Sequence, residues 1–274
     1  MHNVDGDIHG QRLFCGDALD FLASMPSSSA RLVLSSPPYD IGKAYEGRQG
    51  GLEQWLEGQR SILNECCRTL VDGGSLCWQV GSRVERRRDG SAALYPLDAL
   101  LFPVMLGMGL VPRNRVIWTF GHGMHCRQRL SGRYESMLWM TKGDGYLIDL
   151  DAVRVPSKYP GKRHFKGPRR GQLSGNPLGK NPSDVWDIVN VKANHPEKTS
   201  HPCQFPLGLA ERAILAFSAR GETVLDPYAG SGTTLVAALR RGRKGMGSEL
   251  EPTYCAIAEG RLKAEFDKSN GVCL

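Results

Sequence analysis

The sequence predicts an α/β protein whose mostly parallel, twisted sheet is covered by helices on both faces. Short apolar runs typical of buried strands alternate with longer segments whose apolar residues recur at helical spacing. The chain of 274 residues is long enough for one large domain of this kind, and no internal repeat is visible along it.

The first half of the chain alternates strands with helices. Residues 53–72 are predicted as a helix, because their apolar residues recur at helical spacing and are followed by Gly73 and Gly74, a common helix stop. The other elements of this half are predicted as strands at 11–17, 31–36 and 75–81 and as a helix at 18–25.

The middle and the C-terminal parts of the chain continue the alternation. A helix over 95–110 is expected to be kinked by Pro103. Two strands at 114–121 and 134–142 are joined by a glycine-containing connection, which favours antiparallel pairing between them. The remaining elements are predicted as helices at 205–218, 231–242 and 252–266 and as strands at 222–228 and 244–250.

The overall composition favours a polyanionic partner, because 35 Lys and Arg residues against 28 Asp and Glu give a net charge of +7. The apolar runs are interrupted by charge and proline, and the N-terminus lacks a secretory apolar core. We therefore expect a cytoplasmic protein without a membrane span. The eight cysteines form no C-x-x-C pair, which favours reduced thiols over a disulfide framework, and no metal is expected.

Positive charge is concentrated between Arg154 and Lys180, where eight Lys or Arg residues occur and no Asp or Glu. Glycine and proline are frequent in this segment, so it is predicted as a loop. Clustered cations release counterions when they meet phosphates, whereas the alternative is a merely solvated basic loop. The candidates for phosphate contact here are Lys162, Arg163, Lys166, Arg169 and Arg170.

A second basic segment follows the strand predicted at 114–121. Two histidines, His122 and His125, could suggest a metal site, but a third ligand is lacking nearby. Contact with nucleotide phosphates is the preferred interpretation. The candidates in this segment are His122, Arg127, Arg129 and Arg133.

The segment ETVLDPYAGSGTTLVAALRRG predicts a strand, a tight glycine loop and a helix. Glycines allow a close backbone approach to a ligand, and the helix N-terminus offers free N–H groups. It is not a P-loop, because Thr233 stands where a lysine should follow the last glycine. Glu249 ends the next strand, where a carboxylate can accept hydrogen bonds from ribose hydroxyls. A surface charge is the alternative for Glu249.

Residues 35–39 read SSPPY and follow a predicted strand. The prolines restrict φ and hold the backbone extended, so the carbonyl of Pro37 is fixed in direction. The hydroxyl of Ser36 is a second hydrogen-bond acceptor, and Tyr39 offers a ring for stacking. A plain turn after a strand is the alternative when this segment is taken alone.

Together these two segments resemble those of the DNA amino-methyltransferases. DPYAGSGTT is similar to the family's S-adenosylmethionine loop, and SSPPY is similar to its catalytic tetrapeptide. The tetrapeptide comes about 190 residues before the cofactor loop, an order that resembles the circularly permuted β group. Similar segments at GDALDFL, YESMLWMTK and HPEKTSHPCQFP extend the resemblance over nearly the whole chain.

The resemblance implies a Rossmann-like methyltransferase fold, S-adenosylmethionine as cofactor and double-stranded DNA as substrate. Asp17 is expected to accept from the adenine amine, which requires the N-terminal strand to lie beside the last α/β unit. The implied catalytic residues are Ser36, Pro37, Pro38 and Tyr39. The implied cofactor-binding residues are Asp17, Asp226, Pro227, Tyr228, Gly230, Gly232, Thr233, Glu249, Thr199 and Ser200.

Serine before Pro-Pro-Tyr favours cytosine N4 as the target within this family, with adenine N6 as the alternative. Similar sites on RNA or on a protein glutamine amide, and a non-enzymatic DNA-binding nucleoside sensor, are more distant alternatives. Pro202-Cys203-Gln204 resembles the tripeptide of cytosine-C5 methyltransferases, but its place before the cofactor loop argues for a structural cysteine.

The predicted organisation has three parts. Residues 1–153 form the catalytic half of the methyltransferase domain, residues 154–193 with Trp186 a target-recognition region, and residues 194–274 the cofactor-binding half. The family also implies, as a partner, a restriction endonuclease that acts on the same site. The choice between monomer and homodimer stays open.

Overall fold

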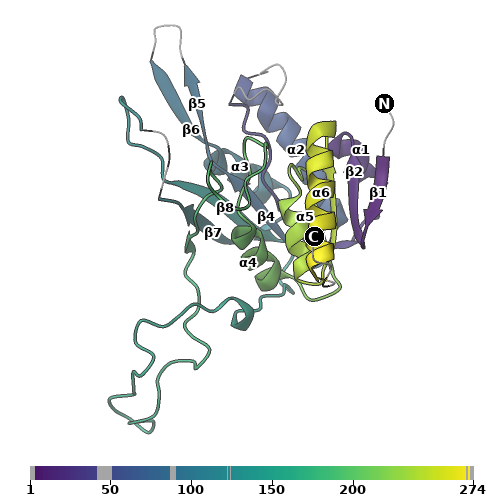
Figure 1. The fold of residues 1–274 in the computed structure, drawn as a ribbon. Coiled ribbons are helices and arrows are strands. Elements are labelled where there is room, and N and C mark those ends of the chain that lie inside the picture. Colours follow the sequence, from purple (N-terminus) through teal and green to yellow (C-terminus); the bar gives the residue numbers. More distant parts are fainter. Residues whose placement is uncertain are drawn as a thin grey trace.

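The computed structural model describes residues 4–41, 51–86, 91–121, 123, 125–269 and 271, so His122 lies outside the described residues. Within them, nine strands form one sheet in the order β1-β2-β11-β10-β3-β4-β8-β7-β9 (Figure 1). The strands of this sheet are β1 (Val4–Ile8), β2 (Gln11–Cys15), β3 (Ala30–Ser35), β4 (Leu70–Val80), β7 (Val111–Thr119), β8 (Tyr134–Thr141), β9 (Val185–Asp187), β10 (Thr223–Asp226) and β11 (Lys244–Glu249).

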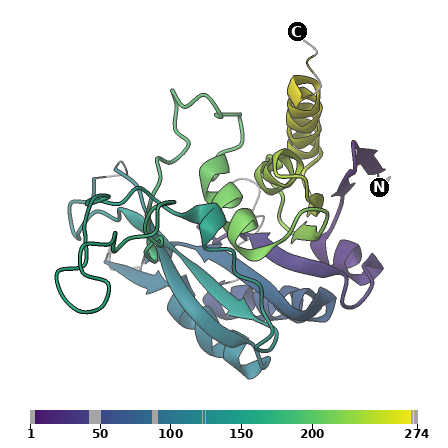
Figure 2. The same cartoon turned by 90° about the horizontal axis from the view of Figure 1, so that it is seen from below.

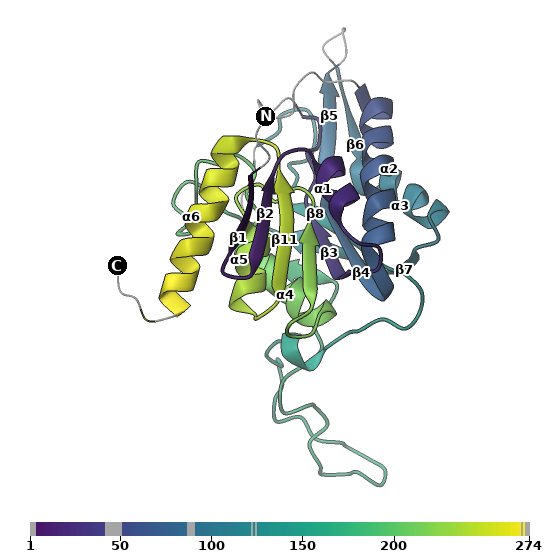
Figure 3. The same cartoon turned by 90° about the vertical axis from the view of Figure 1, so that its right-hand side faces the viewer.

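The centre of the sheet is parallel, as predicted. β2, β11, β10, β3 and β4 pair with their neighbours in parallel register. β8 is antiparallel to both β4 and β7, which confirms the expected pairing of the two strands around residues 112–142. The N-terminal β2 pairs with β11 near the C-terminus, so strands from both ends of the chain lie side by side (Figure 3).

Helices cover both faces of the sheet, because side chains alternate along each strand. In β3, Leu32 and Leu34 pack into the cluster of α4, α5 and α6, whereas Val33 packs into that of α1, α2 and α3. Figures 2 and 3 show the two layers. The helices are α1 (Ala18–Ser24), α2 (Gly51–Thr69), α3 (Leu97–Gly107), α4 (Leu207–Phe217), α5 (Thr233–Arg240) and α6 (Pro252–Ser269), with a 3-10 turn η2 (Asp151–Val153).

The predicted end of the second helix at Gly73 is wrong by several residues. α2 ends at Thr69, and β4 already begins at Leu70, which pairs with Ala30. Gly73 has φ +72°, and a Cβ built there would lie 2.1 Å from the carbonyl oxygen of Gly145. This glycine therefore permits a close backbone crossing rather than a helix stop.

Two segments extend from opposite ends of the sheet (Figures 1 and 3). The hairpin of β5 (Ser82–Arg86) and β6 (Ala92–Pro96) rises beyond the carboxyl ends of the parallel strands. Residues 154–184, named here the basic arm, extend in the opposite direction. Bridges Val155–Lys180 and Arg163–Leu173 join the two sides of the arm. None of the helices in the described parts of the chain is long and apolar enough to cross a membrane.

Candidate active site

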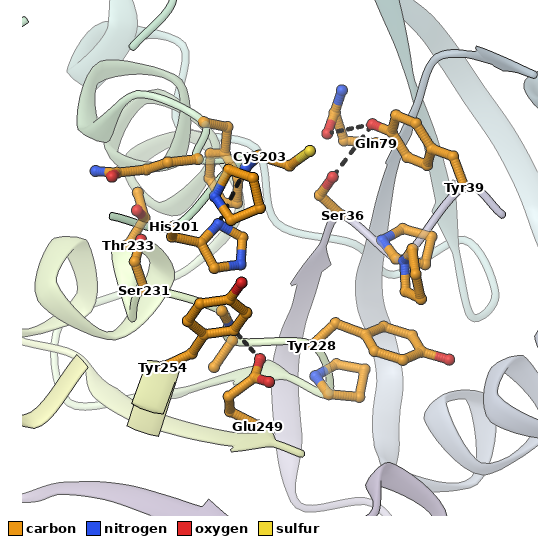
Figure 4. Close-up of a pocket in the computed structure, with 18 of the residues that line it drawn as sticks. Ser36, Tyr39, Gln79, His201, Cys203, Tyr228, Ser231, Thr233, Glu249 and Tyr254 are labelled. Carbon is orange, nitrogen blue, oxygen red and sulfur yellow. Dashed lines mark hydrogen bonds between the residues drawn. The ribbon is translucent and has the colours of Figure 1, made fainter. Parts of the chain in front are cut away.

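A cavity of about 700 Å³ lies at the carboxyl ends of β3, β4, β10 and β11. Such edges of parallel sheets are where ligands bind, because loops from neighbouring strands converge there. The SSPPY loop after β3 and the glycine loop after β10 both line this cavity, so the structure brings the two segments together. In Figure 4, Ser36, Tyr39 and Gln79 lie across the cavity from His201, Tyr254 and Glu249.

The structure separates the predicted cofactor residues into two groups. The residues that line the cavity are Asp17, Pro227, Tyr228, Gly230, Thr233 and Glu249, besides Ser36, Pro37, Pro38 and Tyr39. Asp226 is fully buried behind the loop. Thr199 holds the preceding loop by hydrogen bonds with Gln204, while Ser200 is exposed; neither of the two lines the cavity. The neighbouring His201 lines it instead.

The glycine loop depends on two residues with positive φ. Gly232 precedes α5 with φ +77°, and a Cβ there would lie 2.8 Å from Cβ of Ala258, so it packs directly against α6. Gly230 has φ +55°, and a Cβ there would lie 3.2 Å from Nε2 of His201. Both positions therefore favour glycine, and the loop backbone stays open to a ligand.

Glu249 connects the glycine loop to the end of β11. Its Oε2 accepts from the backbone N–H of Gly230 and its Oε1 from that of Glu251, each at 2.9 Å. Burial raises the pKa of Glu249, and these two hydrogen bonds oppose that shift. Each carboxylate oxygen has a further lone pair, which suits acceptance from vicinal hydroxyls.

Asp17 lies beside Glu249 because of the β2–β11 pairing. Cys15 is opposite Glu249 in the parallel register, and the N–H of Gly16 donates to the carbonyl of Glu249 at 2.9 Å. The required neighbourhood of the N-terminal strand and the last α/β unit is thus present. Asp17 also caps α1, since its Oδ1 accepts from the N–H of Leu19 at 2.7 Å.

Asp226 is a buried acid that supports the loop rather than facing the cavity. Its Oδ1 accepts from the hydroxyl of Ser35 at 2.6 Å and from the N–H of Tyr228 at 3.1 Å. Burial raises its pKa to about 6, against the lowering effect of these hydrogen bonds. The folded protein therefore favours the protonated acid.

Asp226→Asn is expected to stabilise the ligand-free protein at pH 7. The folded pKa lies above the unfolded value of about 3.9, so the wild type loses stability as pH rises from about 4 through 6. The amide avoids that loss and keeps an acceptor for Ser35 and Tyr228. We expect a gain of about 2 kcal/mol in the free energy of unfolding at pH 7, shrinking toward pH 4, by urea denaturation. An equal difference at both pH values would contradict this origin.

The SSPPY loop is held by hydrogen bonds on both sides. The indole Nε1 of Trp55 donates to the carbonyl of Pro38 at 2.7 Å. The hydroxyls of Ser36 and Tyr39 lie 3.2 Å apart, and Tyr39 also contacts a side chain from β4 and one from β8. The carbonyl of Pro37 takes no hydrogen bond from the described residues, so this acceptor remains available at the cavity wall.

Asp40 does not act on the cavity as a base. It is buried with φ +53°, and its carboxylate forms an ion pair with Arg83 at 3.0 Å. Nε of Arg83 donates to the Asp40 carbonyl at 3.0 Å. This pair fixes the exit of the SSPPY loop against the base of the β5–β6 hairpin.

Several cavity residues are absent from the sequence-based prediction. Gln79 from β4 and Glu135 from β8 line the cavity beside Tyr39. Burial raises the pKa of Glu135, while hydrogen bonds from Gln79 and Tyr39 oppose the shift. Their signal in the sequence is weak: a single polar residue within or at the start of an apolar strand. The other unpredicted lining residues include Trp55, Trp118, Phe120, Cys203 and Tyr254.

His201 is neutral at physiological pH. Burial, together with the charges of Lys198 and Arg261, lowers its pKa to about 4. Its Nδ1 accepts from the N–H of Cys203 at 3.2 Å, and its ring packs edge-on against Tyr254. Cys203 itself is exposed at the cavity wall.

The basic candidates lie at two different ends of the molecule. The loop after β7 is at the cavity end, because Phe120 and Glu135 on its two sides both line the cavity; Arg127 and Arg129 in it are exposed. The basic arm, by contrast, extends away from that end (Figure 3). Its exposed cations are Lys162, Arg163, Lys166, Arg169 and Arg170.

Trp186 is not a surface residue of the predicted recognition region. It is 4% exposed and belongs to the main hydrophobic core. Its Nε1 donates to the carbonyl of Ser183, and the guanidinium of Arg212 lies over its ring. Aromatic character in a basic segment therefore marks strand β9 here rather than a nucleic-acid contact.

The cavity suits S-adenosylmethionine. A glycine-bounded cradle, a ribose-height carboxylate at Glu249 and Asp17 at the outer edge provide for a nucleoside, and about 700 Å³ leaves room for a second ligand. The comparisons agree. A crystal structure of TTHA0409, a DNA modification methylase of Thermus thermophilus complexed with S-adenosyl-L-methionine, superposes with TM-score 0.68 and 32% identity, covering 93% of this chain and 94% of that one.

Two curated relatives extend the similarity. The type II methyltransferase M.BglII of Bacillus subtilis is 42% identical over 262 residues, 96% of this chain and 71% of the relative. The DNA adenine methyltransferase YhdJ of Escherichia coli is 30% identical over 254 residues, 90% of this chain and 81% of the relative. The family model N6_N4_Mtase, described as DNA methylase, matches residues 30–260. The chain belongs to this family of S-adenosylmethionine-dependent DNA methyltransferases.

Proposed function

We propose that this enzyme transfers a methyl group to the exocyclic N4 amine of a cytosine that has left the DNA duplex. The observation that carries the proposal is the meeting of the SSPPY loop and the glycine loop at one cavity. S-adenosylmethionine supplies the electrophilic methyl group when bound beside Glu249 and Gly230. The target base then occupies the part of the cavity next to Ser36 and Tyr39.

The chemical task of the SSPPY loop is to activate a poor nucleophile. The lone pair of an exocyclic amine is delocalised into the base. Acceptors at Ser36 Oγ and at the carbonyl of Pro37 bind the two amine hydrogens and favour a pyramidal nitrogen. The prolines hold these acceptors in fixed directions, so positioning provides much of the acceleration.

A base within a duplex cannot reach this cavity, so the target must be extruded. Tyr39 and Phe120 line the cavity and offer rings against an unstacked base. Arg127, Arg129 and Arg133 follow Phe120 in the chain, which supports contacts with the phosphates of the flipped nucleotide. His122 in the same loop lies outside the described residues, and its contact with DNA is proposed from the sequence alone.

Serine before Pro-Pro-Tyr supports cytosine, and adenine N6 is the second candidate. The adenine alternative is favoured by the name of the Escherichia coli relative, which is 30% identical. Serine and aspartate both accept from an amine, so the same loop suits either base.

Mass spectrometry of nucleosides from DNA treated with enzyme and methyl-labelled cofactor distinguishes these outcomes. We expect label in N4-methylcytosine. Label in N6-methyladenine would establish the second candidate. Absence of label from every nucleoside would overturn both and favour a catalytically silent DNA-binding protein.

We propose the same division of the chain as the sequence suggests: a catalytic half at 1–153, a cofactor half at 194–274 and a DNA-contacting region at 154–193. Because the basic arm extends away from the cavity, its contacts would fall on DNA beyond the target base pair. The type II relatives also support a restriction endonuclease of the same specificity as a partner.

Arg169→Ala combined with Arg170→Ala is expected to weaken DNA binding and to lower its salt dependence. Each lost phosphate contact removes about one unit from the slope of log K against log salt, so the slope falls by about two. Lys263→Ala with Lys268→Ala on α6 removes the same charge and serves as control. If both pairs change the slope equally, the arm has no specific contact with DNA.

A further inference from the structure

A chain of hydrogen bonds leads from Ser36 into the sheet. The hydroxyl of Ser36 lies 3.2 Å from that of Tyr39, which in turn lies 3.1 Å from Oε1 of Gln79 and 3.1 Å from Oε2 of Glu135. Nε2 of Gln79 also contacts the same Oε2 of Glu135. Figure 4 shows the bonds of Tyr39 with Ser36 and with Gln79.

The direction of each bond follows from counting hydrogens. An ionised Glu135 carboxylate only accepts, so the Gln79 amide turns its NH2 toward Glu135 and its Oε1 toward Tyr39. Tyr39 has a single hydroxyl hydrogen, and both deeper partners are acceptors. Tyr39 therefore donates inward, and in the contact with Ser36 it can only accept.

From this polarity we infer that Glu135 and Gln79 are positioning residues which, through Tyr39, commit the Ser36 hydroxyl to accept from the target amine. The inference rests on the proposed function of Ser36. With its hydrogen bound to Tyr39, Ser36 turns lone pairs toward the cavity. A freely rotating serine could instead donate to the amine nitrogen and occupy the lone pair that must attack.

The surrounding backbone holds this relay in place. Gln79 is 3% exposed near the end of β4, and Glu135 lies near the start of β8, where Val80 pairs with Ser136. At Gly81 a Cβ would lie 3.2 Å from Cε2 of Tyr39 and 3.2 Å from Oε1 of Glu135. The absence of a side chain at this position lets the tyrosine ring and the carboxylate lie together.

Tyr39→Phe tests the relay, because it keeps the ring and removes only the hydroxyl. We expect kcat to fall about tenfold or more, as for loss of a hydrogen bond to a charged group. The KM for DNA and the Kd for S-adenosylmethionine should stay within about twofold. Tyr134→Phe, which changes an exposed neighbour on β8, serves as the matched control.

Two double-mutant experiments separate the relay from a merely structural role. Ser36→Asp places an acceptor that has no hydrogen to orient, so adding Tyr39→Phe to it should cost less than about twofold. Glu135→Ala should lower kcat in the wild type, yet cost nothing further once Tyr39→Phe is present. This second cycle gives an answer even if Ser36→Asp is inactive.

The relay is wrong if Tyr39→Phe leaves kcat unchanged. It is equally wrong if Glu135→Ala costs the same with and without the Tyr39 hydroxyl. Failure of the proposed function is seen separately, because the wild type would then put no label on any DNA amine.

Discussion

Ser36→Ala is expected to lower kcat for DNA methylation by about 10² to 10³, the range seen when one preorganised hydrogen-bonding group is removed from a reacting centre. Alanine cannot accept from the target amine, and Ser36 lies on the wall opposite Glu249, so cofactor binding should not change (Figure 4). Single-turnover transfer of labelled methyl groups measures the first quantity, and calorimetry with S-adenosylmethionine measures the second.

The matched control for this prediction is Ser61→Ala on the exposed side of α2, where the hydroxyl bonds only to the carbonyl of Glu57. It should leave both quantities unchanged. A kcat of Ser36→Ala within threefold of the wild type would remove Ser36 from the catalytic site. A parallel loss of cofactor affinity would instead indicate that the whole wall has moved.

Glu249→Ala is expected to raise the Kd for S-adenosylmethionine by about 100-fold. Hydrogen bonds to a charged group contribute about 1.5 to 3 kcal/mol each, and the carboxylate is proposed to hold ribose hydroxyls. The change also frees the N–H of Gly230, now bound to Oε2, so the glycine loop loses its connection to β11. Calorimetric titration of the DNA-free enzyme measures the effect.

Glu259→Ala, a partly exposed carboxylate on α6, provides the control and should bind the cofactor normally. Glu249→Gln keeps one acceptor oxygen and should lie between Glu249→Ala and the wild type. Unchanged affinity in Glu249→Ala would exclude the ribose role. Reduced thermal stability without cofactor would measure the part of Glu249 that supports the loop.

The site was predictable where its chemistry is continuous in the sequence. Asp226 to Thr233 and Ser35 to Tyr39 each follow a strand, and parallel strands bring their carboxyl ends to one edge of a sheet, so the two loops meet in one cavity. Gln79 and Glu135 could not be found in this way. They approach only because β4 and β8 pair antiparallel in one register, which no short pattern specifies.

Long-range contacts also explain the other differences. Gly73 and Gly74 look like a helix stop, but the approach of Gly145 to this part of β4 decides their role. The charge of residues 154–180 predicts a solvated basic loop, while its direction, away from the cavity, depends on where η2 and β9 anchor it. Trp186 shows the same limit, because its burial depends on α4.

The β2–β11 pairing has a consequence for the order in which the enzyme becomes functional. Gln11 binds both the carbonyl of Arg243 and the N–H of Gly245, across 232 and 234 residues of sequence. During synthesis the ribosome releases β2 among the first segments and its partner among the last, so this strand waits for most of translation with only the β1 hairpin beside it. The adenosine side of the cavity is closed last, and a nascent chain that stops short of β11 would carry the catalytic serine without the means to hold a methyl donor.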